Sequence, residues 1–333
     1  MKRFLAVILT AVLLLSFASC SKGAPTIDTD GEMSEEIVET TSADTTSADT
    51  TASTAAGTTA GTTAGTTAST SDESAQSSGK SIEETSGDTE ETEPSKVKVA
   101  IFTDPHSALI DTKVNTRRPS LSPVKIKKMM DKFVKMGVEY VICLGDFIEN
   151  AYDDEENTEM LEMMMGIINT YDIPFYTLMG NHDCDAFTKE EFYNITNLEP
   201  APTTARVGDA LFVYLDANFL ADGTSYAPGN IDWKSTLIPQ SQLDFYKTAW
   251  QNTDASEVYV FVHQNIDTNI PNESYWLSNA AQVQAALAEC PKLKGVFQGH
   301  YHKGYNSLIG GVMYRTIPAV CEEENMPYLI IEV

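Results

Sequence analysis

The sequence predicts an α/β fold for residues 96–333. Short apolar stretches with the length of buried strands alternate there with longer segments whose apolar residues recur at helical spacing. The alternation of strand, helix and strand is typical of a parallel sheet covered by helices. Polar residues follow directly after several of the strand-like stretches, for example Asp104 after the stretch at 97–102. The segment is also long enough to form a full hydrophobic core.

The first half of this domain is expected to contain three strands separated by two helices. The strands are predicted at 97–102, 139–145 and 173–180. The first helix covers 122–137, with Ser122 as its N-cap, Pro123 at its first position and Gly137 at its end. The second helix covers 158–171, and we interpret its methionine stripe as core packing.

The second half continues the same pattern and adds a hairpin. Its strands are predicted at 210–216, 257–263 and 295–300, and its helices at 240–251 and 279–290. Gly310 and Gly311 separate two strand-like runs within 305–320, which indicates a hairpin. A last strand is expected at 327–333.

Residues 1–20 have the pattern of an export signal. Lys2 and Arg3 precede an apolar stretch that is shorter than the roughly 20 residues needed to span a bilayer. The stretch ends in Ala-Ser-Cys, which resembles the lipobox of bacterial lipoproteins. This resemblance predicts an exported protein that is anchored through a lipid on Cys20 at the outer face of the bacterial cell membrane. The alternative is an ordinary cleaved signal that happens to contain a cysteine.

Residues 21–95 are expected to form a disordered linker between the signal and the domain. They are rich in Thr, Ser, Ala and Gly, and they contain sixteen acidic residues against only two lysines. The domain itself has 32 acidic and 18 basic residues. Because nucleic-acid polymers are bound through Lys and Arg on phosphates, this acidic chain is not expected to bind them.

All five histidines of the chain lie at the predicted ends of strands. They stand in the motifs Asp104-Pro-His106, Gly-Asn181-His182-Asp183, the strand end at His263, and Gly-His300-Tyr-His302, while Gly-Asp146 ends one further strand. In an open α/β sheet the ligand site lies beyond the carboxyl ends of the strands. We therefore expect these polar groups to converge on one place.

Asp, Asn and His side chains without thiolates suit transition metals such as Mn, Fe or Zn. His300 and His302 are one residue apart at a strand exit, so both project to the same side. There are more candidate ligands than one ion needs. A pair of divalent ions would use them all, and such pairs are typical of enzymes that act on phosphate esters.

In its order and spacing, this set of motifs resembles the calcineurin-like metallophosphoesterase superfamily over about residues 99–333. The resemblance implies a two-sheet β-sandwich flanked by helices. It also implies two metal sites that share Asp146. One site would use Asp104, His106, Asp146 and His302, and the other would use Asp146, Asn181, His263 and His300.

The resemblance further implies that His182 faces the substrate, as a general acid or a charge-stabilising group, and that Asp183 orients it. A hydroxide bridging the two metals would attack the phosphorus. The expected activity is hydrolysis of small phosphodiesters or nucleotide-type phosphate bonds. A phosphomonoesterase such as a surface nucleotidase is the alternative, and a non-catalytic surface binding module is a further one. The second motif lacks the Arg-Gly that follows it in the protein phosphatases, which argues against a phosphoprotein substrate.

Several residues are open to two interpretations. Arg117 and Arg118 would either bind a phosphate or belong to a solvated loop. Tyr226, Trp233, Tyr275 and Trp276 would either stack on a nucleobase or pack locally. Disulfide bonds among Cys143, Cys184, Cys290 and Cys321 cannot be paired from the sequence.

Overall fold

The computed structural model describes residues 96–109, 116–150, 153–322 and 325–333. The signal expected at 1–20, its Cys20 and the linker expected at 21–95 lie outside the described residues. Among the residues that the structure describes, no helix has the length and apolar character needed to cross a bilayer.

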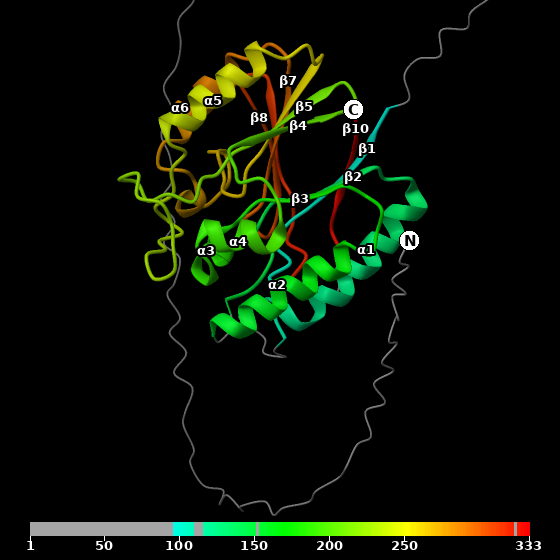
Figure 1. The fold of residues 1–333 in the computed structure, drawn as a ribbon. Helices are drawn as coiled ribbons and strands as arrows, with labels where there is room; N and C mark the ends of the chain where they lie inside the picture. Colours follow the sequence, from blue (N-terminus) through cyan, green and yellow to red (C-terminus); the bar gives the residue numbers. More distant parts are fainter. Residues whose placement is uncertain (1–95, 110–115, 151–152, 323–324) are drawn as a thin grey trace, which may run out of the picture. The chain divides into compact units, whose positions relative to one another are not determined.

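The first sheet has four strands in the order β10-β1-β2-β3. Strands β1 (Lys98–Phe102), β2 (Tyr140–Cys143) and β3 (Phe175–Thr177) are parallel, and β10 (Leu329–Glu332) runs antiparallel to β1. Helices α1 (Ser122–Met136) and α2 (Asp154–Ile168) cover one face of this sheet (Figure 1). The parallel sheet predicted for the first half is confirmed.

The second sheet has six strands in the order β4-β5-β6-β7-β9-β8. Their bounds are β4 (Thr203–Val207), β5 (Ala210–Tyr214), β6 (Glu257–Phe261), β7 (Leu293–Gln298), β8 (Tyr305–Ile309) and β9 (Val312–Thr316). Strands β5, β6, β7 and β9 are parallel, and β8 and β9 form the predicted hairpin. Helices α5 (Gln240–Gln251) and α6 (Ala280–Ala288) pack on this sheet, on the side away from α1 and α2 (Figure 1).

The two sheets pack face to face around a core of their own. Val99 and Ile101 of β1 contribute to this inter-sheet core, while Ala100 and Phe102 of the same strand face the helices. Because side chains alternate across a strand, a strand covered on both faces is apolar throughout. The result is a two-sheet sandwich flanked by helices, which confirms the predicted fold class.

Some elements differ from the predictions. Helix α2 begins at Asp154, four residues before the predicted start, because the Asp153 side chain caps it by accepting from Glu156 N at 2.9 Å. Ser122 is not the N-cap of α1, since its hydroxyl donates to the carbonyl of Pro105 and so ties the helix to the first motif. Gly137 ends α1 in the left-handed conformation, as predicted.

Short elements were not predicted. These are strand β4, helices α3 (Asn181–Ala186) and α4 (Lys189–Thr196), and the 3-10 turns η1 (Pro119–Leu121) and η2 (Glu273–Tyr275). Their apolar residues are too few to give a periodic signal. Helix α3 matters most for the site, because it begins at Asn181 and contains the third motif.

Candidate active site

The polar ends of five strands meet at the rim shared by the two sheets. Strands β1, β2 and β3 of the first sheet lead into the first three motifs, and β6 and β7 of the second sheet lead into the last two. A cavity of about 980 Å³ opens here, with Asp146, Asn181, His182, His300 and His302 in its wall. The convergence predicted from the sequence is therefore found, although it is built from two sheets and not from one.

One group of side chains surrounds the buried carboxylate of Asp104. Its Oδ1 atom lies 3.7 Å from Nε2 of His106 and 3.4 Å from Nε2 of His302. The two imidazole Nε2 atoms are 3.2 Å apart, and Nε2 of His106 is also 3.4 Å from Oδ2 of Asp146. These four side chains point their ligand atoms at one small volume, as expected for one cation.

A second group lies on the other side of Asp146. Oδ2 of Asp146 is 3.3 Å from Nε2 of His263. Ligand atoms of Asp146, His263 and His300 all lie within 4.8 Å of one another, and all three residues are buried. Asn181, the fourth predicted member, is buried in the wall of the same cavity.

Besides Nδ1 of His106, which faces Glu149, four atoms of these two groups are buried without a hydrogen-bond partner among the described residues. They are Oδ1 of Asp104, Oδ1 of Asn181, Nε2 of His263 and Nε2 of His300. Buried polar atoms are normally paired, because leaving one unsatisfied costs about 1–3 kcal/mol. All four are lone-pair donors of the kind that bind divalent transition metals, so the residues present fit metal ions.

The backbone at the site adopts conformations that ordinary residues avoid. Five non-glycine residues of the described chain have positive φ, and four of them are predicted ligands: Asp104 (51°), His106 (43°), Asp146 (49°) and His300 (66°). Such conformations cost of order 1 kcal/mol or more each and persist mainly at functional sites. The packing of the two sheets therefore holds these side chains in strained positions.

Two glycines allow the loops to approach closely. A Cβ atom on Gly180 would lie 2.1 Å from Oδ1 of Asp146, and one on Gly299 would lie 2.1 Å from Oγ1 of Thr103. Neither position has room for a side chain. The glycines in the third and fifth motifs are therefore required by contacts across the site.

Three of the imidazole rings have an oxygen atom close to Nδ1, on the side away from the ligand atoms. Nδ1 of His106 lies 2.9 Å from Oε2 of Glu149, Nδ1 of His263 lies 3.0 Å from the carbonyl of Leu144, and Nδ1 of His302 lies 2.8 Å from Oε1 of Glu322. Such partners fix the tautomer and leave Nε2 free to ligate. Neither glutamate was predicted to have a role, because each comes to the site through the fold and has no strand-end signal.

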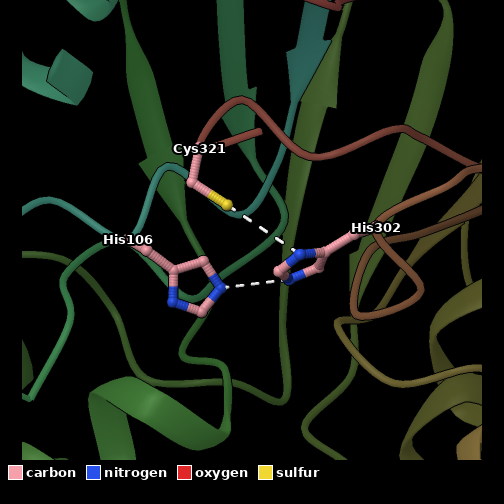
Figure 2. Close-up of side chains that lie close together, drawn as sticks. All are labelled: His106, His302 and Cys321. Atoms are coloured by element: carbon pink, nitrogen blue, oxygen red, sulfur yellow. Dashed lines mark hydrogen bonds between the residues drawn. The ribbon is translucent and has the colours of Figure 1, made fainter. Parts of the chain in front are cut away.

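Cys321 lies beside His302 and His106 (Figure 2). Its Sγ atom is 3.9 Å from Nδ1 of His302, the nitrogen that faces away from His106. Burial raises the pKa of the Cys321 thiol to about 12, so it is protonated at neutral pH. With His106 and His302 it forms a group of side chains that could hold a cation, although its sulfur lies on the Nδ1 side of the His302 ring. All four cysteines in the described chain are free and buried.

The ionisable groups at the site shift one another's pKa values. Burial opposes the charged forms, but the carboxylates around His106, led by Asp146, raise its pKa to about 10. Burial likewise opposes the charge on His302, yet its hydrogen bond with Asp104 raises its pKa to about 9. Burial and the neighbouring His263 lower the pKa of His300 to about 3. Since metals bind neutral imidazole, protons compete with cations at the first two rings.

His182 stands at the mouth of the site and is more exposed than the predicted ligands. Its side chain is 26% exposed, and its Nδ1 atom lies 3.1 Å from Oε1 of Glu149. Asp183 does not make this contact: its carboxylate accepts hydrogen bonds from the backbone N–H groups of Phe147, Ile148 and Gly180. Glu149 is the carboxylate that contacts His182, and the orienting role expected of Asp183 stays a prediction.

Arg117 and Arg118, for which the sequence allowed two interpretations, differ in position. Arg117 is 15% exposed, with Nη2 at 2.8 Å from Oε1 of Glu149 and Nη1 at 3.5 Å from Nε2 of His182. It lines the cavity, whereas Arg118 is exposed and is not among the residues of the cavity wall. Of the two, only Arg117 is placed to meet an anion at the site.

Residues 97–304 match the family model of the calcineurin-like phosphoesterases, and this match covers more than half of the chain. The chain belongs to this family. Calcineurin-like phosphoesterases are metal-dependent hydrolases of phosphate esters.

Several known proteins are similar to parts of this chain. A probable cyclic nucleotide phosphodiesterase of Fibrobacter succinogenes is 24% identical over 195 residues, which are 57% of this chain and 65% of the relative. The chain thus matches less than two thirds of that protein. A dimetal phosphatase from Danio rerio has a TM-score of 0.59 at 16% identity, with 71% of this chain and 92% of that chain covered. A purple acid phosphatase, PPD1, from yellow lupin (Lupinus luteus) has a TM-score of 0.50 at 14% identity, over 72% of this chain and 48% of the other.

Proposed function

We propose that this calcineurin-like phosphoesterase is a two-metal enzyme that hydrolyses small phosphodiesters. The observation that carries the proposal is the position of Asp146. Its Oδ2 atom lies 3.4 Å from Nε2 of His106 and 3.3 Å from Nε2 of His263, and these rings belong to different ligand groups. A carboxylate shared by two imidazole groups is suited to two adjacent cations.

In this proposal Asp104, His106, Asp146 and His302 hold one divalent cation, and Asp146, Asn181, His263 and His300 hold the other. Mn, Fe or Zn suit these ligands best. When bound, such a pair supplies Lewis acidity that activates water and neutralises charge on a phosphate group.

The residues around the ligands have separate roles in the proposal. His182 protonates the leaving oxygen, since its ring is held by Glu149 and is still exposed to the cavity. Arg117, next to His182, provides positive charge for a non-bridging phosphate oxygen. The Glu149 carboxylate contacts His106, His182 and Arg117, so it fixes all three side chains relative to one another.

A small molecule is the favoured substrate because the site lies within a cavity of about 980 Å³. The name of the Fibrobacter succinogenes relative, a probable cyclic nucleotide phosphodiesterase, supports a diester. A phosphomonoester is the alternative, because it would fit the same ligands.

The test is a panel of bis-p-nitrophenyl phosphate, p-nitrophenyl phosphate and cyclic nucleotides, each measured with Mn, Zn, Ni or Mg after chelation of the protein. We expect hydrolysis only after metal is returned, with diesters cleaved faster than the monoester. Full activity of the metal-free protein would refute the metal mechanism. Faster hydrolysis of the monoester than of the diesters would indicate a phosphomonoesterase instead of a diesterase.

We also propose that the enzyme is exported and anchored to the outer face of the membrane through a lipid on Cys20. The proposal rests on the signal-like pattern of residues 1–20. In a bacterial host, Cys20→Ser should move the protein from the detergent phase to the aqueous phase. Unchanged partitioning of this variant would exclude the anchor.

A further inference from the structure

One side of the cavity is a wall of aromatic rings beside His300. The wall consists of Trp233, Tyr275 and Tyr301, all partly exposed and all lining the cavity. The centroid of the Tyr275 ring lies 5.1 Å from that of His300, and that of Trp233 lies 5.9 Å from it. This aromatic wall is therefore adjacent to the second ligand group.

Other aromatic residues of the same loops do not belong to the aromatic wall. Tyr226 is buried, and its hydroxyl donates to backbone carbonyls of Asp232 and Ser235, so it supports the loop. The indole of Trp276 donates to the carbonyl of Ile270 at 3.0 Å, which is also a structural contact. Neither residue lines the cavity. Trp233 and Tyr275 do, although they come from segments about 40 residues apart in the sequence.

The rings of the aromatic wall meet at steep angles. Trp233 and Tyr275 are inclined at 51° with centroids 5.2 Å apart, and Tyr275 and Tyr301 are inclined at 76° with centroids 5.0 Å apart. Tilted rings support one another at their edges without covering each other by parallel stacking. Such a wall can offer a ring face to a planar ligand.

We propose that the aromatic wall of Trp233, Tyr275 and Tyr301 binds the nucleobase of a nucleotide substrate. This inference rests on the proposed function, because it places the phosphate of the same molecule at the adjacent ligand groups. Any of the planar nucleobases can stack on aromatic side chains, because every base has a π-face. The tyrosine hydroxyls can also form hydrogen bonds with the ring heteroatoms of a base. An aliphatic ligand group has no atoms that could form such hydrogen bonds.

The experiment compares two ligands that differ only in the base. Binding of adenosine 5'-monophosphate and of ribose 5-phosphate to the full chain is measured by calorimetry with Mn present. Loss of one base–aromatic stack costs roughly 5- to 150-fold in affinity. We expect the wild type to prefer the nucleotide by a factor in this range. Trp233→Leu should abolish most of the preference while leaving ribose 5-phosphate binding unchanged, and Trp233→Phe should restore part of it.

A matched control is Trp250→Leu, which removes a tryptophan that packs on the second-sheet core and does not line the cavity. This variant should keep the preference for the nucleotide. Equal binding of the two ligands by the wild type, no detectable binding of either, or an equal loss of both in Trp233→Leu would overturn the inference. A protein that prefers the nucleotide but hydrolyses no ester would instead contradict the proposed function.

Discussion

Nδ1 of His106 lies 2.9 Å from the carboxylate of Glu149, and this contact directs the opposite nitrogen of the ring toward Asp104 and Asp146. The second oxygen of the same carboxylate lies 3.1 Å from Nδ1 of His182. Burial opposes the charge on Glu149, but its hydrogen bonds with His106 and His182 hold the pKa of its carboxyl well below the usual range. One ionised side chain therefore orients a predicted ligand and the predicted general acid.

Replacing Glu149 should weaken the site without removing a ligand. Glu149→Gln keeps the size of the side chain but loses the charge that fixes the His106 tautomer. Changes of this kind typically cost 10- to 100-fold in metal affinity or activity. The measurements are metal affinity by competition with a chelating dye, and kcat/KM. Glu162→Gln on the exposed face of α2 is the matched control and should change neither. Wild-type values for Glu149→Gln would show that the contact has no functional role.

His182→Ala should separate chemistry from metal binding. His182 is not needed for either ligand group, so the variant should keep its metal. A general acid typically contributes 10²- to 10⁴-fold, and we expect a loss in that range for esters with alkoxide leaving groups. The loss should be smaller for nitrophenyl esters, whose leaving group needs little protonation. If His182→Ala loses as much metal as His300→Ala, His182 is a ligand and the assigned role is wrong.

Gly180→Ala should disrupt the site by a steric clash. The new Cβ would lie 2.1 Å from Oδ1 and 2.5 Å from the backbone N of Asp146, so the shared carboxylate must move. We expect bound metal and activity to fall together. Gly166→Ala in α2 is the control, because a Cβ there has no neighbour within 4 Å. It should retain activity and gain up to about 1 kcal/mol in unfolding free energy. Full metal content in Gly180→Ala would contradict the close approach of these two loops.

Arg117→Ala should weaken the interaction with the substrate phosphate. A hydrogen bond to a charged group contributes about 1.5–3 kcal/mol, which corresponds to a fall in kcat/KM of roughly 10- to 150-fold. Metal content, measured in parallel, should stay near the wild-type value. Arg118→Ala changes the neighbouring exposed arginine and should leave kcat/KM unaltered. Equal effects of the two substitutions would indicate a general effect of loop charge.

Much of the fold could be predicted because its signals are local. The helix at 240–251 has the predicted bounds, and the hairpin at Gly310 and Gly311 forms as expected. Pairing between distant segments was not predictable from periodicity, as for β10, which adds to the edge of β1 from the far end of the chain. The division of the strands into two sheets likewise came from the family resemblance and not from the apolar pattern.

The site shows the same division between local and distant signals. The histidines and aspartates follow strand ends, so their convergence could be inferred. The partners of Asp183 could not, because its carboxylate binds the backbone of Phe147 and Ile148, which lie about 36 residues earlier in the chain. Glu149 and Glu322 reach their histidines in the same way, through loops that meet only in the folded protein.

The metal content of His300→Ala and His302→Ala tests the central claim most directly. These residues are one position apart, but His302 contacts Asp104 while His300 groups with His263 and Asp146. Elemental analysis after reconstitution with Mn should give two ions per chain in the wild type, and each variant should lose mainly one. Asp146→Ala should lose both. A single ion per wild-type chain, lost equally in all three variants, would contradict the two-metal account.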